Sequence, residues 1–436
     1  MGVRVPYSPD AGRYFGTVAD TDQPAGEQQL PPAPEQVTEF VVEAASALGR
    51  STYPVPQSRE VLRELATAYG VEADVALFPT FVMAEDRQRG TLIMRHVAHS
   101  YRFDQIAESQ EVIAEGCAGG LTASEGIARL RAIEDHKALV PSWLRIVGYA
   151  LSAVGFVLVL QMSMLAVLVG AVLGALVGAA LVFLGPNRRW AVLIPVFATF
   201  ATALLVSLVS VSMGYDVPVR LAAVPVIVLL PGAALTAATV ELVNGDMIAG
   251  ASRLVFAVMQ ILAMAFGFAL AVDVAGLEGQ DLTDLTFNRL PPWLGWVGLV
   301  VYVVGTMLYF CTPWRLWLAS IFVILLTHLV LVMSQLIVSP TLAAGLATAV
   351  AAVAAWTINS GIGGGPASLV LFLPAFWSLI PGSSAFVALT GVITKNSELG
   401  SIGLNAFLTL VSMSIGIMVA SLVFSLQHRE IHFKRG

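Results

Sequence analysis

Ten segments of mainly apolar residues fill the chain from Ser142 almost to its C-terminal end. The hydrocarbon core of a bilayer is about 30 Å thick, and a helix crosses it with about 20 apolar residues. Each segment is apolar around the whole helix, whereas a helix on a soluble core is apolar along one stripe. We therefore predict a mainly α-helical membrane protein with ten transmembrane helices. The segments cover about 143–161, 164–184, 190–211, 219–243, 251–272, 293–311, 314–336, 340–358, 366–393 and 400–426.

Charge is concentrated ahead of these segments. Residues 1–145 contain 13 Lys and Arg and 20 Asp and Glu, whereas residues 146–427 contain 7 and 8. The acidic first part has no basic stripe, which argues against nucleic acid as a partner. Residues 1–35 are rich in proline and poor in large apolar side chains, so we expect a disordered tail without a cleavable signal peptide. We expect residues 36–140 to form a small α+β domain in the cytoplasm.

The pattern of residues 36–140 predicts four helices and one β-hairpin. Apolar residues recur at three- and four-residue spacing in the helical stretches, and two β-like runs flank a polar turn. Thr122 and Glu125 fit a capping box, in which each side chain binds a free backbone N–H at a helix start. The predicted helices cover about 35–49, 59–68, 105–116 and 122–136, and the predicted strands cover 75–83 and 91–97.

The basic residues between the apolar segments predict the orientation of the chain. With the N-terminus in the cytoplasm, nine Lys and Arg face the inside and three face the outside. The positive-inside rule favours this arrangement, with both termini cytoplasmic and the inner membrane as the location. The inside set is Lys137, Arg145, Arg188, Arg189, Arg253, Arg315, Arg429, Lys434 and Arg435, and the outside set is Arg220, Arg289 and Lys395.

The second half of the apolar region repeats the first at an offset of 150 residues. Pro231-Gly232 coincides with Pro381-Gly382, and both pairs lie midway along a long apolar segment. Each copy has five segments, and because five is odd the second copy must enter the membrane from the opposite side. Such inverted repeats are typical of alternating-access transporters, which bind substrate near the midplane, and they also occur in channels. The predicted boundaries are 141–272 and 293–427 for the repeats, 273–292 for an extracytoplasmic loop and 428–436 for a basic cytoplasmic tail.

Three stretches carry a resemblance to a known family. They are GLTASEGIARLRAIE before the first segment, LLPGAALTAATVELVNGDMIAGASRL in the fourth and fifth, and LIPGSSAFVALTGVI in the ninth. With a soluble domain, ten segments and two Pro-Gly helices in this order, the chain resembles the threonine/serine exporter family. The resemblance implies secondary active export of threonine and serine, driven by the proton motive force as an antiport, and no enzyme activity. Relatives that divide the two halves between separate chains are linked to dicarboxylate export, so a small dicarboxylate stays an alternative substrate.

The two Pro-Gly pairs are the first candidates for the substrate site. Proline in a helix interior removes one backbone donor and frees a carbonyl, which needs another partner at membrane depth. A purely structural kink is the alternative. The hydroxyls that follow each break suit a polar amino acid, although isolated Ser and Thr also bind their own helix. The candidates for substrate binding or gating are Pro231, Gly232, Thr236, Thr239, Asn244, Pro381, Gly382, Ser383, Ser384 and Asn396.

Ionisable groups within the apolar segments are few, which makes them candidates for proton coupling. Glu241 and Asp246 flank Asn244-Gly245 at the inner end of the fourth segment, and Arg253 follows seven residues later. A carboxylate there could hold and release the coupling proton; the alternative is a solvated helix end with an Asp246–Arg253 pair. His328 lies in the middle of the seventh segment and is either a proton relay or a hydrogen-bonding partner of a neighbouring helix.

No catalytic, metal or cofactor set stands out in the sequence. His96, His99 and Asp104 lack a further spaced ligand, and Cys117 and Cys311 show no metal-type spacing. A membrane-bound enzyme or a receptor is therefore a weaker alternative than a transporter. The expected partners are the small-molecule substrate and the lipid bilayer, and the sequence leaves homo-oligomer formation open.

Overall fold

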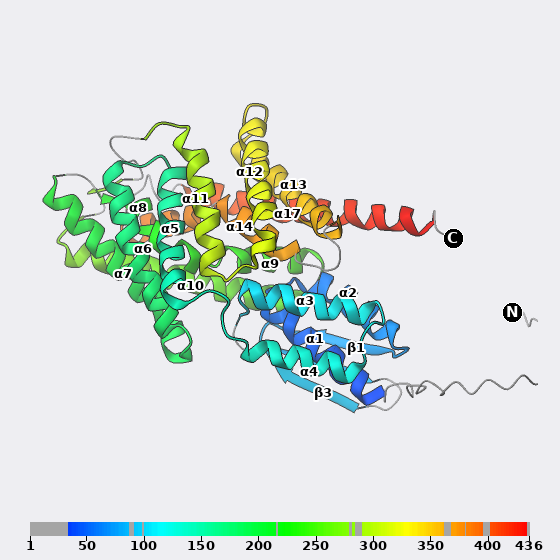
Figure 1. Ribbon diagram of the computed structural model, residues 1–436. Coiled ribbons are helices and arrows are strands. Elements are labelled where there is room, and N and C mark those ends of the chain that lie inside the picture. Colours follow the sequence, from blue (N-terminus) through cyan, green and yellow to red (C-terminus); the bar gives the residue numbers. More distant parts are fainter. Residues whose placement is uncertain are drawn as a thin grey trace, which may run out of the picture.

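The computed structural model in Figure 1 is mainly helical, as predicted, and contains a small sheet. An N-terminal region of helices and strands, residues 34–136, lies at one end of a larger helical bundle. The structure describes residues 34–86, 91–97, 100–214, 217–278, 281–283, 290–361, 368–379, 381–395 and 402–433.

The N-terminal region is built around α1, which packs between the sheet and the other three helices. Phe40 of α1 is fully buried, and a Cβ on Gly126 of α4 would lie 2.4 Å from its ring, so only glycine fits there. The predicted capping box is confirmed, because the N–H of Thr122 donates to Glu125 and the N–H of Glu125 donates to Thr122. The elements are α1 (Pro34–Arg50), α2 (Val55–Ala68), β1 (Ala73–Leu77), β2 (Phe81–Asp86), β3 (Thr91–His96), α3 (Phe103–Cys117) and α4 (Ala123–Asp135).

Two sequence predictions for this region were wrong. The run 75–83 is not one strand but two, because the chain reverses around Pro79, which has no N–H for a sheet ladder. The sheet therefore has three antiparallel strands in the order β1-β2-β3 instead of one hairpin. The second helix begins at Val55 and not at Arg59, since Pro54 precedes it and Pro56 lies in its first turn, where a missing N–H costs nothing.

Apolar helices make up the bundle. Within the part of the chain that the structure describes, seven are long and apolar enough to cross a membrane, or eight if one bent pair counts as a single span. Two shorter apolar helices, α11 and α14, accompany them among the described residues. The predicted fourth and ninth segments are each divided, which is where the structure departs from ten continuous helices. The helical elements are α5 (Ser142–Val159), α6 (Met164–Leu184), α7 (Arg188–Ser212), α8 (Val219–Ala223), η1 (Val224–Leu229), α9 (Gly232–Val243), α10 (Met247–Val274), α11 (Leu294–Tyr309), η3 (Trp314–Leu316), α12 (Trp317–Gln335), α13 (Pro340–Gly361), α14 (Ser368–Ser378), α15 (Pro381–Ile393) and α17 (Ile402–Phe433), with two short strands, β4 (Val217–Pro218) and β5 (Leu282–Thr283).

Helices α5 and α11 cross in antiparallel directions at glycines, where their backbones almost touch. A Cβ on Gly155 would lie 2.4 Å from the backbone nitrogen of Tyr302, and one on Gly305 would lie 2.4 Å from that of Ser152. Gly305 is 150 residues after Gly155, and Tyr302 is 150 residues after Ser152. The two close approaches are therefore equivalent under the offset found in the sequence.

The same offset recurs in the way helices end. Gln161 and Cys311 have φ angles of 53° and 59°, although neither is glycine. Each stands two residues after the end of its helix, α5 or α11, where a left-handed residue commonly terminates a helix. Gly245 and Lys395, also 150 residues apart, have positive φ angles two residues after α9 and α15.

The N-terminal region is attached to the bundle through aromatic stacking at the start of α3. The rings of Phe103 and Phe310 are stacked with centroids 4.6 Å apart, and Trp377 of α14 lies against both. The N–H of Phe103 also donates to the carbonyl of Phe310 at 2.9 Å. This contact holds the N-terminal region beside the ends of α11 and α14.

Candidate functional site

The chain breaks sharply at Pro231, between η1 and α9. The two helical pieces are bent by 65°, and Pro231 is the N-cap of α9, not a residue within one continuous helix. The break frees the carbonyl of Leu229, which accepts a hydrogen bond from the Nε2 of Gln260 on α10 at 2.5 Å. The predicted need for a replacement partner is therefore met by a neighbouring helix.

A small hollow lies beside this break, and one of the residues that line it has a buried hydroxyl without a partner among the described residues. Thr236, one turn into α9, is 3% exposed, and its Oγ1 has no hydrogen-bond partner among the described residues. The hollow has a volume of about 50 Å³, which is room for a few water molecules but not for an amino acid. Its lining comes from α9, α14, α17 and the turn between α1 and α2: Thr52, Pro54, Ala233, Thr236, Ala237, Val240, Leu369, Phe372, Leu373, Phe376 and Ile417.

A buried ion pair stands at the other end of α9. Glu241 is 0% exposed, and its Oε1 lies 3.2 Å from the Nε of Arg253, which is 11% exposed. The same oxygen accepts a hydrogen bond from the backbone N–H of Val55, at the first turn of α2, at 3.3 Å. The second oxygen, Oε2, has no partner within the described part of the chain. Because a buried charge is costly without partners, Glu241 depends on both Arg253 and α2.

Asp246 is bound by α2 as well. Its Oδ1 accepts a hydrogen bond from the Nη2 of Arg59 at 2.6 Å. The alternative of an Asp246–Arg253 pair is therefore wrong, since Arg253 pairs with Glu241 and Asp246 pairs with a residue of the N-terminal region. Helix α2 of the N-terminal region thus binds two carboxylates at the α9–α10 turn, those of Glu241 and Asp246.

The turn between α9 and α10 explains why these groups meet. Gly245 has a φ angle of +85°, which favours glycine, and the N–H of Asp246 donates to the carbonyl of Glu241. A Cβ on Gly250 would lie 2.9 Å from the carbonyl oxygen of Ala238, so glycine lets the two helices pack closely. Arg253, one turn further along α10, is thereby brought beside Glu241.

Several predicted residues lie elsewhere or bind only their own helix. The hydroxyl of Thr239 donates to the carbonyl of Leu235, and the side chain of Asn244 donates to the carbonyl of Val240, each four residues earlier. Neither lines the hollow. His328 lies on α12, with its ring edge-on to Trp296 at 4.9 Å between centroids. Thr236 and Glu241 therefore both lie on α9, whereas His328 lies on a different helix, α12.

The candidates of the second half are only partly described. Pro381 begins α15, so a helix break follows α14 here too. The side chains of Pro381, Gly382, Ser383 and Ser384, and all of Asn396, lie outside the described residues. His99, proposed with His96 and Asp104 as a weak metal candidate, lies outside them as well.

Sequence reasoning missed the residues that other elements contribute to the site. Thr52, Pro54 and Arg59 come from the N-terminal region, and no local pattern indicates that they contact α9 or α10. Gln260 had a usable signal, because it is a lone amide in an otherwise apolar stretch. A polar side chain in such a stretch is expected to serve a neighbouring backbone or a ligand.

Comparison with known proteins gives one match. A family model described as "Putative threonine/serine exporter" matches residues 39–275, from α1 to the end of α10 and more than half of the chain. The matched part includes the break at Pro231, the Glu241–Arg253 pair and the contacts from α2. No curated protein and no solved structure matches.

Proposed function

This chain belongs to the threonine/serine exporter family, and we propose that it exports threonine and serine across the inner membrane as a secondary active transporter. The family makes it a membrane transport protein, in agreement with its long apolar helices.

The observation that carries the proposed site is the unpartnered hydroxyl of Thr236. A buried polar atom without a partner is costly. Of the buried hydroxyls without a partner among the described residues, that of Thr236 belongs to a residue that lines the hollow. The first N–H groups of a helix lack intrahelical partners and favour an anion, such as an amino-acid carboxylate. In our proposal the substrate carboxylate binds at the start of α9, and the hydroxyl of Thr236 hydrogen-bonds to the substrate.

The repeated geometry supports alternating access by two inverted halves. The glycine contacts between α5 and α11 and the left-handed helix ends both recur at an offset of 150 residues. Equivalent helices that run antiparallel are what an inverted repeat requires. We propose that α9 and its counterpart α15 face the substrate from the two halves, and that the halves rock around it.

The N-terminal region acts as the cytoplasmic gate in this proposal. Its turn at Thr52 and Pro54 lies against the hollow, which at about 50 Å³ is closed to an amino acid. Release of α2 from Glu241 and Asp246 would let this turn withdraw. Protonation of Glu241 weakens its pairing with Arg253 and with the N–H of Val55, so a proton could drive that release.

An efflux assay tests the proposal in cells. Cells with and without the protein are loaded with threonine from a dipeptide, and the appearance of threonine, serine and succinate outside is followed. The proposal requires faster efflux of threonine and serine in cells that contain the protein. Faster efflux of succinate alone would replace it with dicarboxylate export, and no difference for any of the three would contradict an export function.

A further inference from the structure

Thr52, in the turn between α1 and α2, has a backbone conformation that threonine rarely adopts. Its φ angle is 56°, in the left-handed region, which is strained for a β-branched residue. The N–H of Thr52 donates to the carbonyl of Gly49, and the N–H of Tyr53 donates to that of Leu48, each at 3.1 Å. These two hydrogen bonds form the Schellman motif at the end of α1, with Thr52 at the position that glycine usually occupies.

Two other helices of the N-terminal region end with glycine at the same position. Gly70 and Gly119 have φ angles of 69° and 72°, and each stands two residues after the end of its helix, α2 or α3, as Thr52 does after α1. Glycine adopts this conformation without strain, whereas threonine does not. A strained residue of this kind is typical of functional sites, so the side chain of Thr52 calls for a role.

Thr52 lines the hollow beside the break at Pro231. Among the described residues that line this hollow, Thr52 and Thr236 are the two with polar side chains, and the others are apolar. Thr236 belongs to α9 of the bundle, whereas Thr52 belongs to the turn that the proposed function assigns to the cytoplasmic gate. Two hydroxyl-bearing residues, one from each part of the protein, therefore border one small apolar space.

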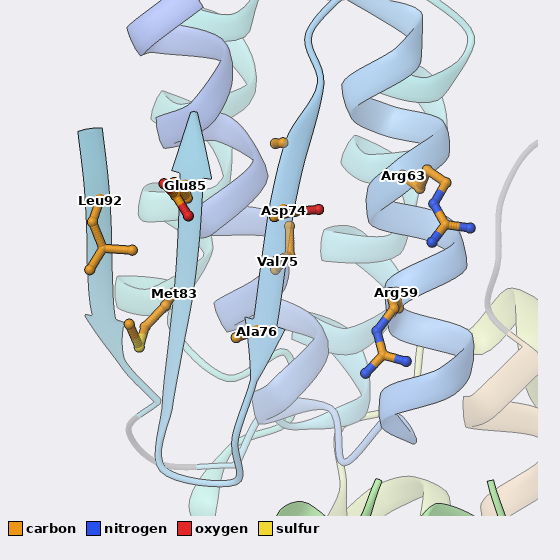
Figure 2. A pocket seen from close by; sticks show the side chains of 9 residues that line it. Arg59, Arg63, Asp74, Val75, Ala76, Met83, Glu85 and Leu92 are labelled. Carbon is orange, nitrogen blue, oxygen red and sulfur yellow. The ribbon is translucent and has the colours of Figure 1, made fainter. Parts of the chain in front are cut away.

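A larger cavity in the N-terminal region does not account for Thr52. This cavity has a volume of about 340 Å³ and lies between α2 and the strands, with Arg59 and Arg63 on the α2 side (Figure 2). Its lining residues on α2 begin at Arg59, and Thr52 is not one of them. The strained residue therefore borders the hollow at Thr236 and not the larger cavity.

We propose that Thr52 selects the substrate, because its hydroxyl hydrogen-bonds to the side-chain hydroxyl of threonine or serine while α9 and Thr236 bind the rest. This inference rests on the proposed function and adds the group that distinguishes hydroxylated amino acids from apolar ones. The hollow is too small for an amino acid, so it widens on binding, and the turn with Thr52 closes over the substrate. A site that hydrogen-bonds a substrate hydroxyl disfavours the analogue without one, since its own polar group then lacks a partner.

Counterflow of labelled L-threonine into vesicles with the purified full-length protein tests this inference, with unlabelled L-threonine or L-valine as competitor. Valine has the shape of threonine, with a methyl group in place of the hydroxyl. In the wild type, threonine should compete about tenfold better than valine, the effect of one hydrogen bond. Thr52→Val keeps a β-branched side chain and removes the hydroxyl, so the two competitors should become nearly equal.

Three further variants separate the hydroxyl from the backbone. Thr52→Ser should recover most of the preference for threonine that Thr52→Val loses. Thr52→Gly removes the strain together with the hydroxyl, so it should melt at or above the wild-type temperature and still lose the preference. Thr67→Val is the matched control, because the hydroxyl of Thr67 lies exposed on α2 and donates to the carbonyl of Arg63. It should keep the wild-type preference.

The outcomes distinguish this inference from the proposed function. Threonine counterflow without a preference over valine, a preference that survives in Thr52→Val and Thr52→Gly, or one that Thr52→Ser does not restore would overturn the role of Thr52 and leave threonine transport intact. Absence of threonine counterflow in the wild type would overturn the proposed function, and this inference with it. Melting curves of each variant identify any loss that comes from misfolding.

Discussion

The backbone N–H of Val55 and the Oε1 of Glu241 are 3.3 Å apart, although 186 residues separate them in the chain. This contact joins the first turn of α2 to a carboxylate that is fully buried at the end of α9. The N-terminal region is therefore part of the candidate site and not a separate appendage. In the proposed mechanism its position depends on the charge of Glu241.

The Glu241–Arg253 pair should behave as a coupled unit in unfolding. Glu241→Gln or Arg253→Met alone leaves its partner buried without its counter-charge, which should cost about 3 kcal/mol, the lower end for a broken buried pair. Replacement of both by methionine should cost less than the sum of the two single changes. Thermal unfolding in detergent measures this, and additive losses would show that the two residues do not interact.

Proton coupling should depend on Glu241 more than on Asp246. Glu241 is fully buried, whereas Asp246 pairs with Arg59, whose side chain is 43% exposed. In vesicles with an imposed pH gradient, Glu241→Gln should make threonine flux insensitive to the gradient, and Asp246→Asn should keep the response. If neither variant alters the gradient dependence, the acidic gate is wrong.

The break at Pro231 should be required for transport and not for insertion. Pro231→Ala restores a backbone N–H and allows η1 and α9 to join into one helix. The N–H groups at the start of α9 would then be hydrogen-bonded within that helix and no longer open to a substrate. We expect threonine export to fall several-fold with an unchanged amount of protein in the membrane. Pro195→Ala is the matched control, because Pro195 lies inside the continuous helix α7. Wild-type export in Pro231→Ala would remove the broken helix from the mechanism.

Cys117 reports on the packing of the N-terminal region. Burial, with a smaller contribution from the charge of Glu64, raises the pKa of its thiol to about 12. The thiolate is the reactive form, so alkylation at pH 8 should be about a thousandfold slower than in the unfolded chain and should accelerate as the pH rises toward 12. A Cys311→Ser background isolates this thiol. Equal rates in the folded and unfolded protein would contradict the packing of α3 on α2.

Local signals predicted much of this fold. The apolar segments gave the positions of the long helices, and Thr122 with Glu125 gave the start of α4. The Pro231-Gly232 pair indicated a break in the helix, and the structure has a 65° bend there. These features depend on neighbours in the sequence, so a single chain reveals them.

Contacts between distant parts of the chain could not be predicted in the same way. The sequence left an Asp246–Arg253 pair open as one alternative, since the two residues are near in sequence, yet Asp246 pairs with Arg59 and Arg253 pairs with Glu241. Which arginine pairs with which carboxylate depends on how the N-terminal region packs against the bundle. Pro79 was overlooked for a different reason, because the apolar run around it hid a turn between two strands.

The central claim is that substrate binds beside α9 at Thr236, and a matched pair of hydroxyl deletions tests it most directly. Thr236 and Thr239 are three residues apart on the same helix, but the hydroxyl of Thr239 is bound to Leu235 and that of Thr236 has no partner among the described residues. Purified wild-type protein, Thr236→Val and Thr239→Val are reconstituted into vesicles, and counterflow of labelled threonine is measured. We predict that Thr236→Val reduces counterflow about tenfold, the effect of losing about 1.4 kcal/mol of binding, whereas Thr239→Val stays near wild type. Equal counterflow in the two variants would contradict the site.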